Sequence, residues 1–215
     1  KVFIESRGAV HVQPDVIFNI GETESSAKSK SLSLNKTPVD NLLDAIAAIK
    51  ESKSIVIIPG YGMAVAQAQF NVAKLSQKLF NMGKTVRFAI HPVAGRMPGH
   101  MHVVLAEAGI DYNLFYEMDA INGELKNTDI ALVVGACDVI NPAAIAIEGT
   151  PLSGMPILMA QDASKIIVCN LDEKPGYSGI ENLLYQNPKA ILLFGDALKT
   201  ISALIEGLSP HITDD

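Results

Sequence analysis

Cysteine is scarce in this chain of 215 residues, and tryptophan is absent. The two cysteines, Cys137 and Cys169, lie inside apolar runs and are not spaced as a Cys-x-x-Cys pair. A scaffold built on disulfides and a thiolate zinc site are therefore both excluded, because each needs several cysteines at defined spacing. We interpret both cysteines as buried thiols.

An excess of positive charge is also missing. The chain has 17 Lys and Arg residues against 23 Asp and Glu residues, which gives a formal net charge of -6. Nucleic acids and anionic membrane surfaces are bound by clustered Lys and Arg side chains. We therefore predict neither of them as a partner.

Long apolar runs are lacking as well. A membrane-spanning helix needs roughly 18 or more uninterrupted apolar residues, and the best candidate, residues 130–147, is interrupted by Asp138, Asn141 and Pro142. We predict no transmembrane segment in this chain. No charged start is followed by an apolar signal core, and the first residue is Lys1, so we expect a piece of a longer protein.

The composition does contain enough apolar material for a folded core, since 48% of the residues are hydrophobic. Residues 1–36 include the serine-rich stretch ETESSAKSKSLSLNK, and we interpret them as an N-terminal arm and flexible linker. Residues 37–208 are interpreted as one dinucleotide-binding domain, and residues 209–215 as a C-terminal tail. The domain opens with a helix that Thr37, Pro38 and Asp40 predict.

From Ser54 onward, short apolar runs alternate with helical segments, which is typical of βαβ units and a parallel sheet. We predict an α/β fold with a Rossmann-like, six-stranded parallel sheet and helices on both faces. The expected strands are residues 54–58, 85–90, 112–116, 130–134, 165–169 and 190–194. The expected helices are residues 62–82, 102–108 and 196–206, each followed by a glycine.

Ligands of open parallel sheets bind beyond the carboxyl ends of the strands. After the first strand the chain reads Gly60, Tyr61, Gly62, Met63, Ala64 and Val65. The glycines and small residues permit a tight turn and let a pyrophosphate approach the amides of a helix N-terminus. The third glycine of the GxGxxG fingerprint is replaced by Val65, so a plain strand-to-helix turn is an equal alternative.

The second strand runs into a loop rich in proline and glycine that carries Val93, Ala94, Gly95, Arg96, Met97 and Pro98. Arg96 is a candidate for binding a phosphate through its planar set of donors, and a solvated surface arginine is the alternative. His91 and His100 lack carboxylate neighbours at metal-binding spacing. We predict no metal in this protein.

After the fourth strand come Gly135, Ala136, Asp138 and Val139, which place a carboxylate in a mostly apolar loop. Asp138 is a candidate for proton exchange, and a capping Asp held by backbone amides is the alternative. Residues 148–156 contain two glycines and two prolines and are long enough to fold over a ligand as a lid.

The segments after the fifth and sixth strands supply further candidates for nucleotide contact. Tyr177 is expected to lie on an adenine or ribose face or to be an ordinary half-buried aromatic residue. The candidates of these segments are Asn170, Leu171, Asp172, Lys174, Gly176 and Tyr177, and then Gly195, Asp196 and Ala197.

Together these loops resemble a known protein family. PGYGMAVAQAQ, HPVAGRMPGHM, GACDVINPAA, GMP at 154–156, GYSG and FGDA occur in the order and spacing of the third, NADP(H)-binding domain of proton-translocating transhydrogenase, the C-terminal domain of its beta subunit. The resemblance covers about residues 38–207. It implies an oxidoreductase component that binds NADP(H) and is active only with its partners, the NAD(H)-binding domain and the membrane domain of the same transhydrogenase.

The resemblance also assigns roles to residues. It implies that Gly60–Val65, Val93–Met97 and Gly195–Ala197 contact the nucleotide, and that Asp138 couples nucleotide binding to proton movement in the membrane domain. Hydride would pass directly to NAD(H) on the partner, so the protein would orient the ring and exclude water. The implied chain is a peripheral soluble domain on the cytoplasmic or matrix side of a membrane protein, in a dimeric enzyme.

One departure bears on the choice of cofactor. The family has Lys-Arg-Ser after the fifth strand, whose cations hold the 2′-phosphate, and the aligned residues here are Asn170, Leu171 and Asp172. An acidic residue near the ribose favours a free 2′-hydroxyl, as in NAD sites. The alternative function is therefore an NAD(H)-preferring or non-catalytic nucleotide-binding module. A stand-alone dehydrogenase ranks third, because the sequence shows no substrate domain and no evident acid/base pair.

Overall fold

The structure is a computed structural model that describes residues 37–209. The expected arm and linker, residues 1–36, and residues 210–215 of the expected tail lie outside the described part. The helices, 3-10 helices (η) and strands follow in chain order: α1 Pro38–Glu51, β1 Ser54–Pro59, α2 Tyr61–Val65, α3 Gln69–Asn81, β2 Thr85–Ile90, α4 His100–Glu107, η1 Tyr112–Leu114, β3 Phe115–Glu117, α5 Met118–Leu125, β4 Ile130–Val134, η2 Asp138–Ile140, α6 Ala143–Ala146, η3 Ala160–Asp162, β5 Lys165–Cys169, η4 Leu183–Gln186, β6 Ala190–Leu192 and α7 Ala197–Gly207.

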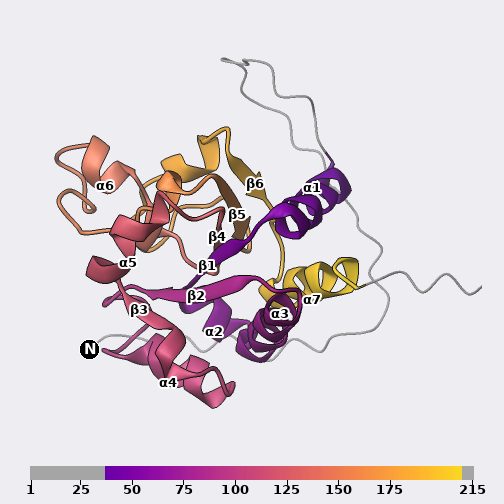
Figure 1. Ribbon diagram of the computed structural model, residues 1–215. Coiled ribbons are helices and arrows are strands. Elements are labelled where there is room, and N and C mark those ends of the chain that lie inside the picture. The colour runs from indigo at the N-terminus through magenta and orange to yellow at the C-terminus, as the bar shows by residue number, and fades with distance from the viewer. Residues whose placement is uncertain (1–36, 210–215) are drawn as a thin grey trace, which may run out of the picture. The chain divides into compact units, whose positions relative to one another are not determined.

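The strands form one parallel sheet in the order β3-β2-β1-β4-β5-β6 (Figure 1). This confirms the predicted six-stranded, Rossmann-like α/β fold. The strand order reverses between β1 and β4, whose last paired residues are Pro59 and Val134. A crevice at such a reversal is where doubly wound sheets bind their ligands.

Successive side chains of the central strands point to opposite faces of the sheet, and those that are buried are apolar, so helices cover both faces. Ile55 and Ile57 of β1 belong to a core shared with α1, α3, α4 and α7. Val56 and Ile58 point the other way and pack with α5 and the segments around η2, η3 and η4. Because both faces are covered, the central strands consist of consecutive buried residues, as parallel strands require.

The expected helix over residues 62–82 is wrong in its middle, where it is broken into α2 and α3. The amides of Gln67 and Ala68 donate to the carbonyls of Ala64 and Met63, at 3.1 and 3.0 Å. This pair of bonds is the Schellman motif that ends a helix, and it puts Gln67 in the left-handed region with φ 53°. The same bonds end α3, with Gly83 at the left-handed position.

The predicted strand over residues 112–116 is also wrong in part. Asp111 accepts a hydrogen bond from the amide of Asn113 at 2.9 Å, which starts the 3-10 helix η1 and leaves only Phe115–Glu117 as strand β3. The helices α5 and α6 were not predicted. Both are short, and α5 follows β3 directly without a turn residue between them.

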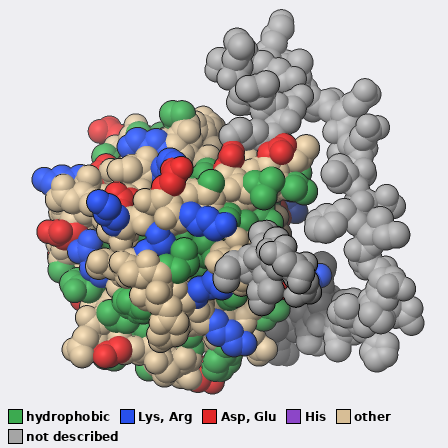
Figure 2. All heavy atoms as spheres, turned by 45° about the vertical axis from the view of Figure 1, so that its right-hand side comes forward, with side chains coloured by type: hydrophobic (Ala, Val, Ile, Leu, Met, Phe, Trp, Pro, Cys, Tyr) green, Lys and Arg blue, Asp and Glu red, His purple; other side chains and the backbone are tan. Residues whose placement is uncertain are grey.

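Acidic and basic side chains are interspersed over the face of the molecule that Figure 2 shows. Elsewhere among the described residues, Lys165 forms an exposed ion pair with Glu51, with 3.7 Å between Nζ and Oε2. Within residues 37–209, no helix combines the length and the apolar character that crossing a bilayer requires.

The amino ends of the two central strands are joined by Asp129. Its Oδ2 accepts the amides of Lys53 at 2.7 Å and Ser54 at 2.9 Å. These bonds lower the pKa of the Asp129 carboxyl, the Lys53 amide most and the Ser54 amide next. Because the pKa is lower in the folded than in the unfolded chain, the stabilisation is complete above the unfolded value of 3.8 and is lost as the pH falls through the folded pKa.

We expect Asp129→Asn to lower the free energy of unfolding by about 1 kcal/mol at pH 7, because the exposed Lys53 amide and the half-buried Ser54 amide lose a charged acceptor that solvent partly screens. The deficit should shrink as the pH is lowered below 4, where the wild-type carboxyl also takes up a proton. Urea unfolding of both proteins at several pH values measures the effect. Glu107→Gln, at an exposed position, is the control, and an equal loss in this variant would contradict the assignment.

We expect Gln67→Gly to raise the free energy of unfolding by about 0.5–1 kcal/mol, because glycine adopts the left-handed conformation without strain. Gly83→Gln is the reciprocal variant, since Gly83 occupies the same position at the end of α3 and has open space around it. It should destabilise the protein by a similar amount. Thermal and urea unfolding measure the stability of both variants. If Gln67→Gly is no more stable than the wild type, the backbone at Gln67 is not strained.

Candidate functional site

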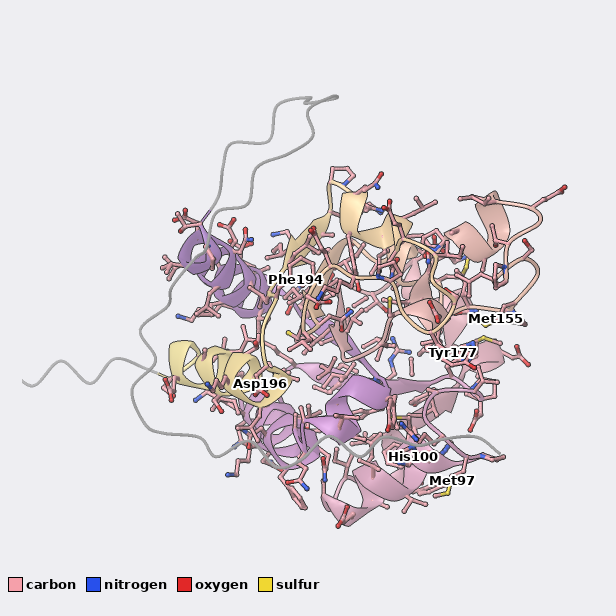
Figure 3. The ribbon with its side chains drawn as sticks, turned by 180° about the vertical axis from the view of Figure 1, so that it is seen from behind. Met97, His100, Met155, Tyr177, Phe194 and Asp196 are labelled. Carbon is pink, nitrogen blue, oxygen red and sulfur yellow. The ribbon has the colours of Figure 1, made fainter. Side chains whose placement is uncertain are left out.

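The loops at the carboxyl edge of β1, β2, β4 and β5 surround one cleft of about 1030 Å³. Its volume lies at the upper end of the ~300–1,000 Å³ that is usual for ligand sites. Figure 3 shows Met155 and Tyr177 together on the side of the molecule that also carries Met97 and His100. The lining residues are Gly60, Tyr61, Gly62, Val93, Ala94, Gly95, Arg96, Gly135, Ala136, Cys137, Asp138, Val139, Pro151, Leu152, Met155, Gly176, Tyr177 and Ser178.

The floor of the cleft is a direct backbone contact between the loops that follow β1 and β4. The amides of Gly60 and Gly62 donate to the carbonyls of Val134 and Gly135, both at 2.9 Å. A Cβ atom on Gly60 would come within 2.2 Å of the Gly135 carbonyl oxygen, and one on Gly135 within 2.1 Å of the Met63 amide nitrogen. Side chains are thus excluded at both positions.

This contact modifies the expected pyrophosphate cradle. A pyrophosphate was expected to approach the amides at the N-terminus of the helix after β1, but the amides of Gly60 and Gly62 there already donate to backbone carbonyls of β4 and its loop. Met63 is fully buried in the core, and its amide donates to Gly60 O at 3.1 Å. The glycines therefore serve first to bring two loops together, and the small residues leave space above them.

Arg96 lies over the ring of Tyr61, with 4.8 Å between the guanidinium carbon and the ring centroid. None of the ion pairs among residues 37–209 involves Arg96. The loop beneath it is held by a bond from the Arg96 amide to His100 Nδ1, at 3.1 Å, and by the left-handed conformation of Gly95. An exposed guanidinium without a carboxylate partner at the edge of a cleft can bind an anion.

His91 connects the β2 loop to the segment that was expected to be a lid. The amide of Val93 donates to His91 Nδ1 at 3.2 Å, so the proton of the neutral ring is on Nε2, which donates to the carbonyl of Pro156 at 2.8 Å. Burial lowers the pKa of His91, and the bond to Pro156 opposes this effect. His91 is consequently a neutral structural link between two walls of the cleft.

The segment 148–156 lies where the sequence suggested, beside the cleft. It is held in a turn by Ser153, whose hydroxyl donates to Ile147 O at 2.9 Å and accepts the Thr150 amide at 2.8 Å. Leu152 is buried against Ala144 and other residues of a small separate core. Hydrogen bonds within the segment and this small core therefore hold its conformation.

Asp138 binds the segment that follows β5. Its carboxylate accepts the amide of Ser178 at 2.9 Å and the hydroxyl of Ser178 at 2.8 Å. Gly176 is so close that a Cβ atom there would lie 2.7 Å from Asp138 Oδ1. The carboxylate therefore joins two loops across the cleft, which goes beyond the local cap that was the alternative.

Cys137 also lines the cleft, although the sequence suggested only a buried thiol. Burial raises its pKa, while the hydroxyl of Tyr185 and the amide of Asn182, each 3.7 Å from Sγ, act in the opposite direction. Cys169 is fully buried in the core, and burial raises its pKa to about 12. Both cysteines are free thiols.

Of the candidates after β5, Gly176 and Tyr177 line the cleft, whereas four earlier residues of the segment do not. Asn170 is buried, and its amide donates to Ala136 O and to the Tyr185 hydroxyl, both at 2.7 Å. Leu171 is 72% exposed. Asp172 and Lys174 pair with each other, with 3.5 Å between Oδ2 and Nζ.

The residues after β6 lie elsewhere. Asp196 caps α7 by accepting the amide of Lys199 at 3.1 Å. Figure 3 shows Phe194 and Asp196 on the side of the view opposite Tyr177 and Met155. The expected contact residues that do not line the cleft are Met63, Ala64, Val65, Met97, Pro98, Asn170, Leu171, Asp172, Lys174, Gly195, Asp196 and Ala197.

Five lining residues were not among the expected contacts: Cys137, Pro151, Leu152, Met155 and Ser178. Cys137 and Ser178 are direct neighbours in sequence of expected residues, and the other three belong to the expected lid. Their nearness in the chain was the available signal.

Comparison with known proteins gives the family. Residues 11–207 match the family model described as NAD(P) transhydrogenase beta subunit. Two curated beta subunits of this enzyme from Rhodospirillum rubrum, one of them from strain ATCC 11170, are each 42% identical over 166 residues, covering 77% of this chain and 36% of their own length. The chain thus spans about a third of the length of these relatives.

A solved structure shares the fold alone. A Mycobacterium smegmatis protein described as a thiamin diphosphate-dependent enzyme superposes with a TM-score of 0.50 and 16% identity, covering 82% of this chain and 28% of that one. The family model, in contrast, matches most of the sequence, including every loop of the cleft. The chain therefore belongs to the NAD(P) transhydrogenase beta subunit family.

Proposed function

We propose that this chain is the NADP(H)-binding domain of a proton-translocating transhydrogenase and positions the nicotinamide for direct hydride transfer with NAD(H) on a partner domain. The supporting observation is the cleft above the Gly60–Gly135 contact, because it lies at the reversal of strand order and is walled by the family's motifs. Its volume and its glycine-rich walls fit an extended dinucleotide, and Arg96 offers a cation for its phosphates.

When bound, the nicotinamide ring supplies the hydride chemistry. The protein's part is to bind, orient and exclude water. Val93, Ala94 and Gly95 line one wall of the cleft, and Gly176, Tyr177 and the 151–155 segment line the others. His91 fixes the first wall to the segment ending at Pro156 through two hydrogen bonds, so these walls hold a defined separation before any ligand arrives.

The proposed partners and location follow from the same assignment. The chain would work with the NAD(H)-binding domain and the membrane domain of one transhydrogenase, in a dimeric enzyme, as a peripheral domain on the cytoplasmic or matrix side. Asp138 would couple nucleotide binding to proton movement, since its carboxylate holds Ser178 at the cleft. Residues 37–208 would form the nucleotide-binding domain and residues 1–36 its connection.

A second candidate is an NAD(H)-preferring or non-catalytic nucleotide-binding module. The observation that favours it is the chemistry after β5, where Asn170 is held in the framework and Lys174 pairs with Asp172. Within the described residues of that segment, no unpaired cation is available for a 2′-phosphate. Asp172 would instead suit a free ribose hydroxyl.

Calorimetric titration of the purified chain with NADP⁺, NADPH, NAD⁺ and NADH in parallel distinguishes the NADP(H)-binding domain from the NAD(H)-preferring module. We expect NADP(H) to bind at least about tenfold more tightly than NAD(H), a difference of about 1.4 kcal/mol. The two nucleotides differ only in the 2′-phosphate, so each serves as the matched control for the other. A preference for NAD(H) would establish the second candidate, and no binding by any of the four would sink both.

We expect Asp138→Asn to flatten the pH dependence of nucleotide binding, because the variant removes the carboxyl that can take up a proton. Ser178→Ala is the matched control, since it removes the hydroxyl bond to Asp138 but keeps the carboxyl. The affinity for NADPH, measured from pH 5 to pH 9 for all three proteins, separates the two effects. An Asp138→Asn profile that parallels the wild-type profile would remove Asp138 from proton coupling.

A further inference from the structure

Tyr61 stands in the sequence between the two glycines of the β1 loop that form the floor of the cleft. The amides of Gly60 and Gly62 donate to backbone carbonyls of β4 and its loop, both at 2.9 Å. The backbone on either side of Tyr61 is therefore held against the sheet. Tyr61 is half-buried and is the first residue of α2. The contact that fixes the floor thus also fixes the point from which the Tyr61 ring projects.

The guanidinium of Arg96 lies over this ring. The distance from Arg96 Cζ to the ring centroid is 4.8 Å, which is within the roughly 6 Å at which an aromatic ring attracts a cation. Unlike an ion pair, a contact with a ring does not need to occupy the N–H donors of the guanidinium. The ion pairs found in the described part of the chain, residues 37–209, do not include Arg96. The ring thus holds the cation while its donors stay available to an anion.

The backbone of Arg96 is held from the side of α4. Its amide donates to His100 Nδ1 at 3.1 Å, and the centroids of the His100 and Tyr61 rings are 6.1 Å apart. Gly95 has a φ of 104°, and a Cβ atom there would lie 2.4 Å from His100 Nδ1. His100 therefore fixes where the Arg96 side chain begins, and Tyr61 fixes where it ends.

Two open spaces border the Arg96 guanidinium. Tyr61 and Arg96 both line the cleft, and both also line a second hollow of about 400 Å³. An arginine side chain has many rotamers, and ordering such a side chain when a ligand binds costs conformational entropy. A guanidinium that is already held at the boundary of the cleft avoids part of this cost.

We propose that Tyr61 is a positioning residue whose ring holds the Arg96 guanidinium at the edge of the cleft, where it binds a phosphate of the dinucleotide. This inference rests on the proposed function and adds to it an action of Tyr61 that passes through Arg96. That action is separate from any contact between the ring and the ligand. It needs the face of an aromatic ring, which phenylalanine also offers, and does not need the phenol hydroxyl.

A double-mutant cycle on nucleotide affinity tests this action. The wild type, Tyr61→Leu, Arg96→Ala and the variant with both changes are titrated by calorimetry with NADPH or NADH, whichever the wild type binds more tightly. We expect Arg96→Ala to weaken binding at least about tenfold and Tyr61→Leu at least about threefold. In the Arg96→Ala background, Tyr61→Leu should weaken binding less than about twofold, because residues that act through one another are not additive.

Two further variants separate the ring from other roles of Tyr61. Tyr61→Phe keeps the ring and should bind within about twofold of the wild type. Tyr177→Leu is the matched control, because Tyr177 also lines the cleft and lies on the same side of the molecule as His100 (Figure 3). The two contacts between a cation and a ring within residues 37–209 are formed by Tyr61 and Tyr116. Any loss caused by Tyr177→Leu should therefore be equal with and without Arg96.

Circular dichroism melting curves of all variants are recorded first, and Tyr61→Met replaces Tyr61→Leu if that variant does not fold. The positioning role would be overturned by an equal loss from Tyr61→Leu with and without Arg96, by no loss from Tyr61→Leu, or by a loss in Tyr61→Phe as large as in Tyr61→Leu. In each of these cases nucleotide binding by the wild type, and with it the proposed function, would stand. A wild-type chain that binds neither nucleotide would instead remove the proposed function itself and this inference with it.

Discussion

The site depends on one close contact, the packing of the β1 loop backbone against the β4 loop backbone. With Gly60 N–H on Val134 O and Gly62 N–H on Gly135 O, the two loops are joined by direct hydrogen bonds and leave no space for a Cβ atom on either side. A side chain at Gly60 or Gly135 would therefore force the two loops apart. The cleft lies above this contact, so the two loops that define its floor cannot shift independently.

Much of the fold could be predicted because buried parallel strands have short apolar sequences that are separated by helical segments. The prediction failed where a change in backbone direction is not marked by a particular type of residue. Gly83 ends α3 in a Schellman motif and was recognisable as a helix stop, whereas Gln67 ends α2 with the same hydrogen bonds and was not. Tertiary packing around α2 holds Gln67 in a left-handed conformation that glutamine disfavours. A single sequence does not reveal that the fold accepts this energetic cost.

The candidate site could be predicted as a set of loops, because the carboxyl ends of parallel strands lie along one edge of a sheet. The direction in which each side chain points could not, because it depends on partners distant in sequence. Asn170 turns inward to Ala136 and Tyr185, and His91 reaches Pro156, 65 residues away. Asp138 could be identified as a carboxylate near the cleft, but its bond to Ser178 crosses between two loops that only the fold brings together.

The floor of the cleft and the wall formed by residues 176–178 are attached to the rest of the structure by different kinds of contact. The floor is held by hydrogen bonds between backbone groups of the β1 loop and those of β4 and its loop. The wall formed by residues 176–178 is instead held by one side chain, that of Asp138, which accepts two hydrogen bonds from Ser178. The Asp138 carboxylate is the acceptor of both Ser178 bonds, so this wall is attached through one side chain, whereas the glycine floor is attached through the backbone. The position of this wall therefore depends on a single side chain, whereas the floor depends on hydrogen bonds between backbone groups.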